Sequence, residues 1–260
     1  MAMAKAKSKP VLPLFSTFFC LFMAVTAADW NIVNRRNKNG LKISLKNYCE
    51  SWRLNVELHN VRYFKLVPEE CVGYIGNYVT STQYKVDSER TIEECIVYLT
   101  KGCSLKGDGT DAWIFDIDDT LISTVPYYKK IQYGGKKLNI TDLEAWMSGA
   151  KAPVLGHTLR FFNLLKAKGV DIILISARRE ALRSATIENL VQKGYHGWSD
   201  LFFRSDEEKD VEKYKSDVRR RLVKGGYCIW GILGDQYSSL EGTPSGRRTF
   251  KLPNPMYYVA

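Results

Sequence analysis

Histidine is scarce in this chain, and the spacing of its cysteines is unlike that of a metal site. There are three His among 260 residues, and no two of the six Cys form a Cys-x-x-Cys pair. Because zinc sites rely on these ligands at close spacing, the sequence argues against a zinc-binding module. A long basic stripe is also missing, since only Arg35-Arg36 and Arg219-Arg220-Arg221 are clustered. We therefore predict no nucleic-acid partner, although the formal charge of +10 favours anionic small molecules or wall polymers.

A membrane span needs about 20 apolar residues, and the apolar run at residues 14–28 is shorter. It follows three lysines and ends on Val25-Thr26-Ala27-Ala28, a pattern typical of a secretory signal peptide. We expect residues 1–28 to be cleaved, the alternative being an uncleaved anchor, and we expect no stable membrane insertion afterwards. Cleavage would lower the formal charge to +7, because it removes three lysines and no acid. The predicted destination is the secretory pathway, ending in the vacuole or in the extracellular space and cell wall.

The secretory pathway is an oxidising compartment, which permits disulfides. Cys20 would leave with the signal peptide, and four cysteines then cluster before residue 105. Disulfides are expected among Cys49, Cys71, Cys95 and Cys103, with the pairing open. Cys228 lies in an apolar run and is expected to be a buried thiol.

Residues 29–105 show no strong strand signal and are predicted to form an N-terminal helical segment packed on a core. Mixed apolar and polar spacing predicts helices over residues 49–60, 69–84 and 88–105. Thr91 and Glu94 have the spacing of a capping box, which places the start of the last helix near residue 88. Gly107-Asp108-Gly109 is a turn that ends the segment.

From residue 106 onward, short apolar runs alternate with longer amphipathic ones. Strands are predicted at residues 112–115, 170–175, 201–203, 227–233 and 249–252, and helices at 155–168, 180–193 and 214–224. This alternation indicates an α/β fold with a parallel sheet. Residues 122–154 are too long for a simple loop, so we predict a small cap with a short helix at 141–147. Asn139-Ile140-Thr141 in this insertion is a glycosylation sequon.

The apolar run at residues 112–115 leads directly into Asp116-Ile117-Asp118-Asp119-Thr120-Leu121. Ionised carboxylates at the end of a buried strand are costly unless a cation or hydrogen bonds compensate them. Asp116 and Asp118 therefore suggest a shared metal, the alternative being an Asx-rich turn.

Three further residues join this pair because ligands bind at the carboxyl ends of parallel strands. Ser176 and Asp235 each follow an apolar run, and Lys215 lies near the start of a predicted helix. Taken singly, Ser176 could be a helix N-cap, Lys215 a surface lysine and Asp235 part of a turn. Together, they suggest phosphoryl transfer: carboxylates that hold Mg²⁺, an Asp nucleophile, an Asp acid/base, and a hydroxyl and a lysine on the phosphate.

The motif Asp116–Leu121 resembles the first motif of the haloacid dehalogenase (HAD) type phosphatases. More closely, the mature chain resembles the plant class B acid phosphatases and vegetative storage proteins. The stretches that carry this resemblance are residues 48–52, 67–71, 113–121, 126–128, 175–178, 214–216, 232–236 and 248–258. It implies a HAD-like Rossmannoid parallel sheet with helices on both faces and a small helical cap.

The resemblance also implies roles for individual residues. Asp116 would be the nucleophile, Asp118 the acid/base, and Ser176 and Lys215 the phosphate ligands. Mg²⁺ would be held by Asp116, the backbone carbonyl of Asp118, and Asp235. Phosphate monoesters are the implied substrates, and family relatives commonly form homodimers.

The chain departs from the family at two positions. Asp119 replaces a common Glu, which we expect to matter little. Ser239 replaces an Asp that usually supports the metal or the lysine, which could slow turnover by roughly 10–100-fold. The sequence therefore predicts an acid phosphatase, the alternatives being a storage protein with weak or no activity and a phosphate-binding module without turnover.

Overall fold

The computed structural model describes residues 35–36 and 42–259. The predicted signal peptide lies outside the described residues. The chain divides into two compact units, Met1–Glu50 and Ser51–Ala260, and the boundary predicted near residue 105 stays a prediction. In the first unit, β1 (Arg35–Arg36) pairs with β2 (Lys42–Ile43) in an antiparallel ladder that the sequence did not indicate. Helix α2 spans Leu45–Glu57.

A five-stranded parallel sheet forms the centre of the second unit, as predicted. Its order is β5 (Asp200–Arg204), β4 (Asp171–Arg179), β3 (Asp111–Phe115), β6 (Cys228–Gly234) and β7 (Arg248–Lys251). All four neighbouring pairs are parallel. The strands form where apolar runs were found in the sequence. The three central strands are largely apolar because they are covered on both faces, whereas the edge strand β7 exposes Arg248 and Thr249. β3 lies at the centre of the sheet.

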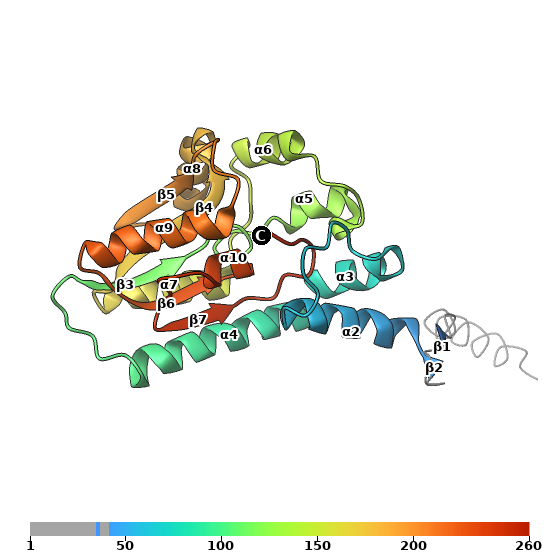
Figure 1. Ribbon diagram of the computed structural model, residues 1–260, viewed down its shortest axis with the longest axis horizontal. Helices are drawn as coiled ribbons and strands as arrows, with labels where there is room; N and C mark the ends of the chain where they lie inside the picture. The colour runs from blue at the N-terminus through green and yellow to red at the C-terminus, as the bar shows by residue number, and fades with distance from the viewer. Residues whose placement is uncertain (1–34, 37–41, 260) are drawn as a thin grey trace, which may run out of the picture. The chain divides into compact units, whose positions relative to one another are not determined.

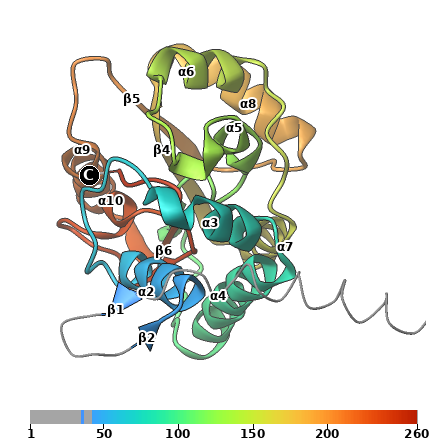
Figure 2. The same cartoon turned by 90° about the vertical axis from the view of Figure 1, so that its right-hand side faces the viewer.

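Helices cover both faces of this sheet, in agreement with the predicted fold class (Figures 1 and 2). On one face, α4 (Thr82–Lys101) and α7 (Gly156–Ala167) bury apolar side chains against Trp113 and Phe115 of β3. On the other face, α9 (Val211–Lys224) packs against Ile114. The alternation of side chains along β3 thus supplies both layers of the core. α8 (Arg183–Gln192), preceded by the turn Glu180–Leu182, connects β4 to β5.

The predicted helix start near residue 88 is wrong. The structure has α3 (Val72–Val79), preceded by the turn Glu69–Cys71, and then a single α4 that begins at Thr82. The Ser81 hydroxyl caps α4 by accepting a hydrogen bond from the Tyr84 amide at 3.3 Å. Thr91 instead donates to the Asp87 carbonyl one turn earlier. A capping-box spacing inside a long helix is therefore satisfied by intrahelical bonds.

The predicted cap insertion contains two short helices, α5 (Val125–Lys130) and α6 (Ile140–Ser148), with the turn Gln132–Gly134 between them. Its two ends are joined by an antiparallel bridge between Ile122 and Val154. Asn139 is exposed and caps α6, because its Oδ1 accepts hydrogen bonds from two backbone amides. The sequon at Asn139 therefore lies on the surface, and its glycosylation stays a prediction.

The cysteines differ in part from the prediction. Cys49 and Cys71 are each disulfide-bonded, whereas Cys95 and Cys103 carry free thiols. Burial of Cys95 against the apolar core raises the pKa of its thiol, which keeps it protonated. Cys228 is also a free thiol, but it is partly exposed instead of buried.

Candidate active site

Asp116 lies directly beyond the central strand, where its amide still pairs with Leu233 of β6. Its Oδ1 accepts a hydrogen bond from the Ile117 amide at 2.8 Å. Its Oδ2 lies 2.7 Å from the ammonium nitrogen of Lys215. Burial of a carboxylate is tolerated here because a cation and hydrogen bonds compensate the charge.

Lys215 projects from the fifth position of α9 and is only 2% exposed, so the surface-lysine alternative is wrong. Its ammonium group also donates to the hydroxyl of Ser239 at 2.8 Å. Ser239, in α10 (Tyr237–Leu240), donates in turn to Asp116 Oδ2 at 2.7 Å. Ser239, which stands where the family usually has an Asp, therefore links the candidate nucleophile Asp116 to Lys215 without adding a charge.

Asp118 pairs with Arg178 from β4, a partner that the sequence did not assign. Arg178 donates to both carboxylate oxygens, at 2.9 Å from Nε and 2.7 Å from Nη2. Burial opposes the charge of Arg178, but Asp118 raises the pKa of the guanidinium above its ordinary value. A bidentate pair of this kind fixes the carboxylate in orientation as well as in place.

Ser176 is fully buried and accepts a hydrogen bond from the Arg178 amide at 3.1 Å. It is not a helix N-cap, because β4 continues through it to Arg179. The other four predicted residues, Asp116, Asp118, Lys215 and Asp235, line one pocket, whereas Ser176 lies outside that lining.

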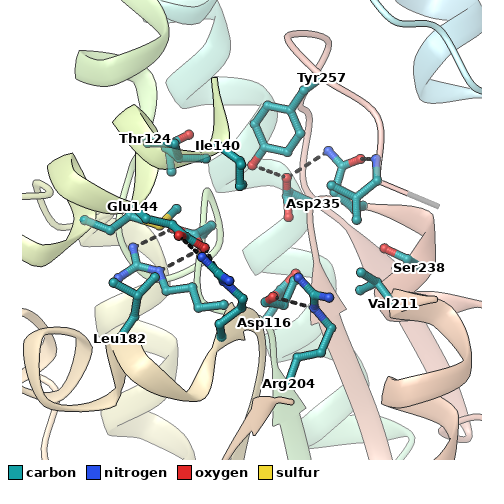
Figure 3. Close-up of a pocket in the computed structure, with 18 of the residues that line it drawn as sticks. Asp116, Thr124, Ile140, Glu144, Leu182, Arg204, Val211, Asp235, Ser238 and Tyr257 are labelled. Carbon is teal, nitrogen blue, oxygen red and sulfur yellow. Dashed lines mark hydrogen bonds and ion pairs between the residues drawn. The ribbon is translucent and has the colours of Figure 1, made fainter. Parts of the chain in front are cut away.

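Asp235 and Asp119 form a buried acidic pair. The Tyr257 hydroxyl contacts Asp235 Oδ2 at 3.2 Å (Figure 3). The same hydroxyl contacts Asp119 Oδ2 at 2.8 Å, and the Asn254 amide donates to Asp235 at 2.7 Å. Burial, followed by the charges of Asp116 and Asp119, raises the pKa of Asp235 to about 7. Burial likewise raises the pKa of Asp119 to about 6. Since one hydroxyl proton serves two carboxyl groups, protonation of the pair stabilises this arrangement.

The role of Asp119 and Tyr257 was not foreseen. Asp119 was expected to matter little, but it is completely buried with a left-handed backbone (φ 46°) and holds Thr124 as well as Tyr257. Tyr257 comes from the segment after β7, about 140 residues away along the chain. Its signal in the sequence was present only as part of the motif at residues 248–258.

The residues present fit a magnesium ion. Asp235 Oδ1 is buried and has no hydrogen-bond partner, although its second oxygen accepts several. An orphaned carboxylate oxygen is the donor that Mg²⁺ prefers. Among the residues that the structure describes, no group of three or more His, Cys, Asp or Glu side chains is arranged around a metal. The predicted set differs from such a group, because it combines two carboxylates with one backbone carbonyl.

The pocket has a polar floor and an apolar wall. Its volume is about 200 Å³. The cap supplies Leu138, Ile140, Leu143 and Met147 to the wall, and Tyr128 and Tyr257 stack on each other beside the floor. Glu144 of α6 forms an ion pair with Arg179 of β4, which ties the cap to the core (Figure 3). Among the described residues, no helix is long and apolar enough to cross a membrane.

The sequence-family model of the HAD superfamily, subfamily IIIB (acid phosphatase), matches residues 35–260. The chain is 38% identical to acid phosphatase 1 of Solanum lycopersicum, over 81% of this chain and 83% of that protein. It is 43% identical to vegetative storage protein 1 of Arabidopsis thaliana, over 85% and 82%.

Among solved structures, the fold is similar to the class C acid phosphatase from Bacillus anthracis with tungstate bound. The TM-score is 0.61 at 23% identity, covering 72% of this chain and 85% of the other. At this level of identity, the likeness establishes the shared fold.

Proposed function

The chain belongs to the acid phosphatases of HAD subfamily IIIB, and from this membership we propose that it hydrolyses phosphate monoesters through a phosphorylated Asp116. The observation that carries the proposal is the contact between Asp116 and Lys215 at the floor of the pocket, 2.7 Å long and almost closed to solvent. A carboxylate held beside a buried cation can approach a phosphate dianion, because the cation offsets the repulsion.

In the proposed reaction, one oxygen of Asp116 attacks the phosphorus, and the bond from phosphorus to the ester oxygen breaks. Asp118 gives a proton to the departing alcohol and then takes a proton from the water that attacks the aspartyl-phosphate. Release of phosphate regenerates both carboxyl groups. Arg178 keeps Asp118 in position, and Lys215 neutralises the equatorial oxygens of the phosphate.

Ser176 accepts from the Arg178 amide, which leaves its hydroxyl proton free to donate to a phosphate. Its proposed role as a phosphate ligand requires that this proton reach the phosphate from outside the pocket lining. Mg²⁺ would be held by Asp116, the Asp118 carbonyl and the unpaired oxygen of Asp235. When bound, it supplies positive charge that offsets the repulsion between nucleophile and phosphate.

A storage protein with weak or no turnover is the second candidate. The 43% identity to vegetative storage protein 1 and the serine at position 239 favour it. Both candidates are compatible with the proposed secretion to the vacuole or cell wall, with a glycan on Asn139 and with a homodimer. They differ only in whether the site turns over.

Hydrolysis of p-nitrophenyl phosphate, with and without Mg²⁺, separates the two candidates. We expect Asp116→Asn to lower kcat by a factor on the order of 1,000 or more, because the nucleophile is lost. The matched control is Asp217→Asn, since Asp217 lies on α9 near Lys215 but pairs with Lys213 and Arg220 outside the pocket. Equal activity in Asp116→Asn and wild type would refute the mechanism. A folded wild type without activity would support the storage candidate.

A further inference from the structure

The charged side chains that line the pocket pair with one another except for two. The lining holds four cations (Arg178, Arg179, Arg204 and Lys215) and four acids (Asp116, Asp118, Glu144 and Asp235). Three pairs form: Lys215 with Asp116, Arg178 with Asp118, and Arg179 with Glu144. Within residues 42–259, no ion pair joins either of the remaining two charges, Arg204 and Asp235, to another group. The proposed metal would compensate the charge of Asp235, so Arg204 is the charged side chain of the pocket that still needs a partner.

The guanidinium of Arg204 is held in place by backbone carbonyls. Its Nε donates to Ala177 at 3.1 Å, and its Nη1 donates to Glu208. No described residue accepts a hydrogen bond from its Nη2. Because Nε and Nη1 are fixed by these hydrogen bonds, the guanidinium is already oriented, and Nη2 remains available as a donor. Such a group binds an anion with little loss of side-chain entropy.

Three of the four acids at positions 206–210 are engaged elsewhere, and no ion pair or hydrogen bond joins the fourth, the exposed Glu207, to Arg204. The side chain of Asp206 pairs with Arg179 at 3.5 Å, and that of Glu208 pairs with Lys213 at 3.1 Å. Asp210 caps α9 by accepting from the Lys213 amide. Arg204 and Arg179 are also register partners on neighbouring strands, yet only Arg179 is neutralised by acids. The free charge of Arg204 is therefore a local feature of the pocket.

Arg204 differs from Lys215 in what it contacts. Lys215 touches Asp116, where the transferred phosphate reacts, whereas neither Asp116 nor Asp118 forms an ion pair or hydrogen bond with Arg204 in the part of the chain described. The apolar side chains Leu138, Ile140, Leu143 and Met147 line the same pocket. Figure 3 shows Arg204 among the side chains around this pocket, together with Ile140, Glu144 and Leu182 of its apolar and cap sides.

We propose that Arg204 is a second anion subsite, and that the preferred substrates are phosphate monoesters whose leaving group has an apolar body and carries a further carboxylate or phosphate. The proposal rests on the proposed function, because it names the substrate class of the same pocket. The apolar body would contact the cap, and the second anion would accept hydrogen bonds from Arg204. Monoesters without the second anion would leave the guanidinium unpaired.

The test compares phenyl phosphate with 3- and 4-carboxyphenyl phosphate. All three probes have an apolar ring, and two of them carry a carboxylate. The two ring positions place this carboxylate at different distances from the phosphate. We expect Arg204→Gln to lower the ratio of kcat/KM for the better carboxylated ester to kcat/KM for phenyl phosphate by roughly 10–100-fold. Arg204→Lys should retain part of the preference, because it keeps the charge and loses the fork.

Arg183→Gln is the matched control. Arg183 also donates to a backbone carbonyl of β5, that of Leu201, but it pairs with Glu180 and does not line the pocket. We expect this variant to keep the wild-type ratio. Thermal unfolding of each variant establishes that the protein is folded.

Three results would overturn the subsite: no preference for either carboxylated ester in wild type, an equal loss on all three esters in Arg204→Gln, or the same change in Arg183→Gln. An equal loss would mean that Arg204 binds the transferred phosphate. To separate this inference from the proposed function, the dissociation constants of the three esters are measured by calorimetry in Asp116→Asn with Arg or Gln at position 204. If wild type has no activity, the proposed function fails, and the binding ratio still decides the subsite.

Discussion

At the scale of single residues, Ser239 joins the two charged side chains at the floor of the pocket. Its hydroxyl accepts from Lys215 and donates to Asp116. It is buried, so water does not replace it. A serine can therefore hold the lysine beside the proposed nucleophile, at a position where the family commonly has an acid.

Replacement of Ser239 by Ala should lower kcat/KM for p-nitrophenyl phosphate by roughly 10–100-fold, because the lysine and the nucleophile lose their shared partner. Ser238→Ala is the matched control: it removes the neighbouring hydroxyl, which has no hydrogen-bond partner in the structure, and should change the rate less. Ser239→Asp tests the departure from the family, since a higher rate would show that serine limits turnover. Equal rates in Ser239→Ala and Ser238→Ala would contradict the bridging role.

At the scale of elements, two strands and two helices bring the charges together. β3 and β6 end beside each other and deliver Asp116 and Asp235 to the same edge, while α9 directs Lys215 toward them. The cap helix α6 is held to β4 by the pair between Glu144 and Arg179. The apolar wall of the pocket is therefore positioned by an ion pair as well as by packing.

The start of α4 gives a prediction on stability. Ser81→Ala should lower the free energy of unfolding by about 1 kcal/mol, because the Ser81 hydroxyl accepts a hydrogen bond from the Tyr84 amide at the first turn of the helix. Thr91→Ala should cost less, since its hydroxyl bonds to a carbonyl inside the helix. Urea unfolding of both variants provides the measurement. A larger loss in Thr91→Ala would place the helix start where the capping-box spacing suggested.

At the scale of the whole molecule, the buried pair of Asp119 and Asp235 predicts that stability depends on pH and on the proposed metal. Both pKa values are raised, to about 6 and about 7, by burial and by neighbouring charge. In the unfolded chain, an Asp titrates near 3.9. Between pH 4 and 7, the metal-free folded protein therefore holds protons that the unfolded chain has released, and its stability falls as the pH rises through this window.

In EDTA, we expect the Tm of wild type to fall by several degrees relative to Asp235→Asn as the pH rises from 4.5 to 7.5. Asp235→Asn removes the carboxylate with the larger rise in pKa and with it the larger part of the dependence, while the part due to Asp119 remains. Addition of Mg²⁺ should restore the wild type at the higher pH, because a bound cation replaces the protons. Calorimetry at several pH values measures both effects. Parallel curves of Tm against pH for wild type and Asp235→Asn would show that the pair is not the source of the pH dependence.

Much of this molecule could be predicted from the sequence, because the information is local. The apolar runs predicted the strands of the sheet, because a strand buried on both faces can be identified from its own apolar residues, without knowledge of the strands beside it. The rule that ligands bind at the carboxyl ends of such strands placed Asp116 and Asp235 at one edge. The same pattern suggested Ser176 and Lys215 as phosphate ligands, roles that the family resemblance also implies, but only Lys215 lines the pocket.

The tertiary structure alone decided which charges compensate each other. Arg178 pairs with an acid 60 residues away, and Tyr257 reaches Asp119 across 138 residues, so no local pattern marks either contact. The same holds for Ser239, which the sequence identified as a departure and the fold made a bridge. Arg204 looked like any other arginine in the sequence, and only the fold showed that no described acid forms an ion pair with it. Backbone elements follow from residues that are neighbours in the chain, whereas the electrostatics of a buried pocket depend on side chains that only folding makes neighbours.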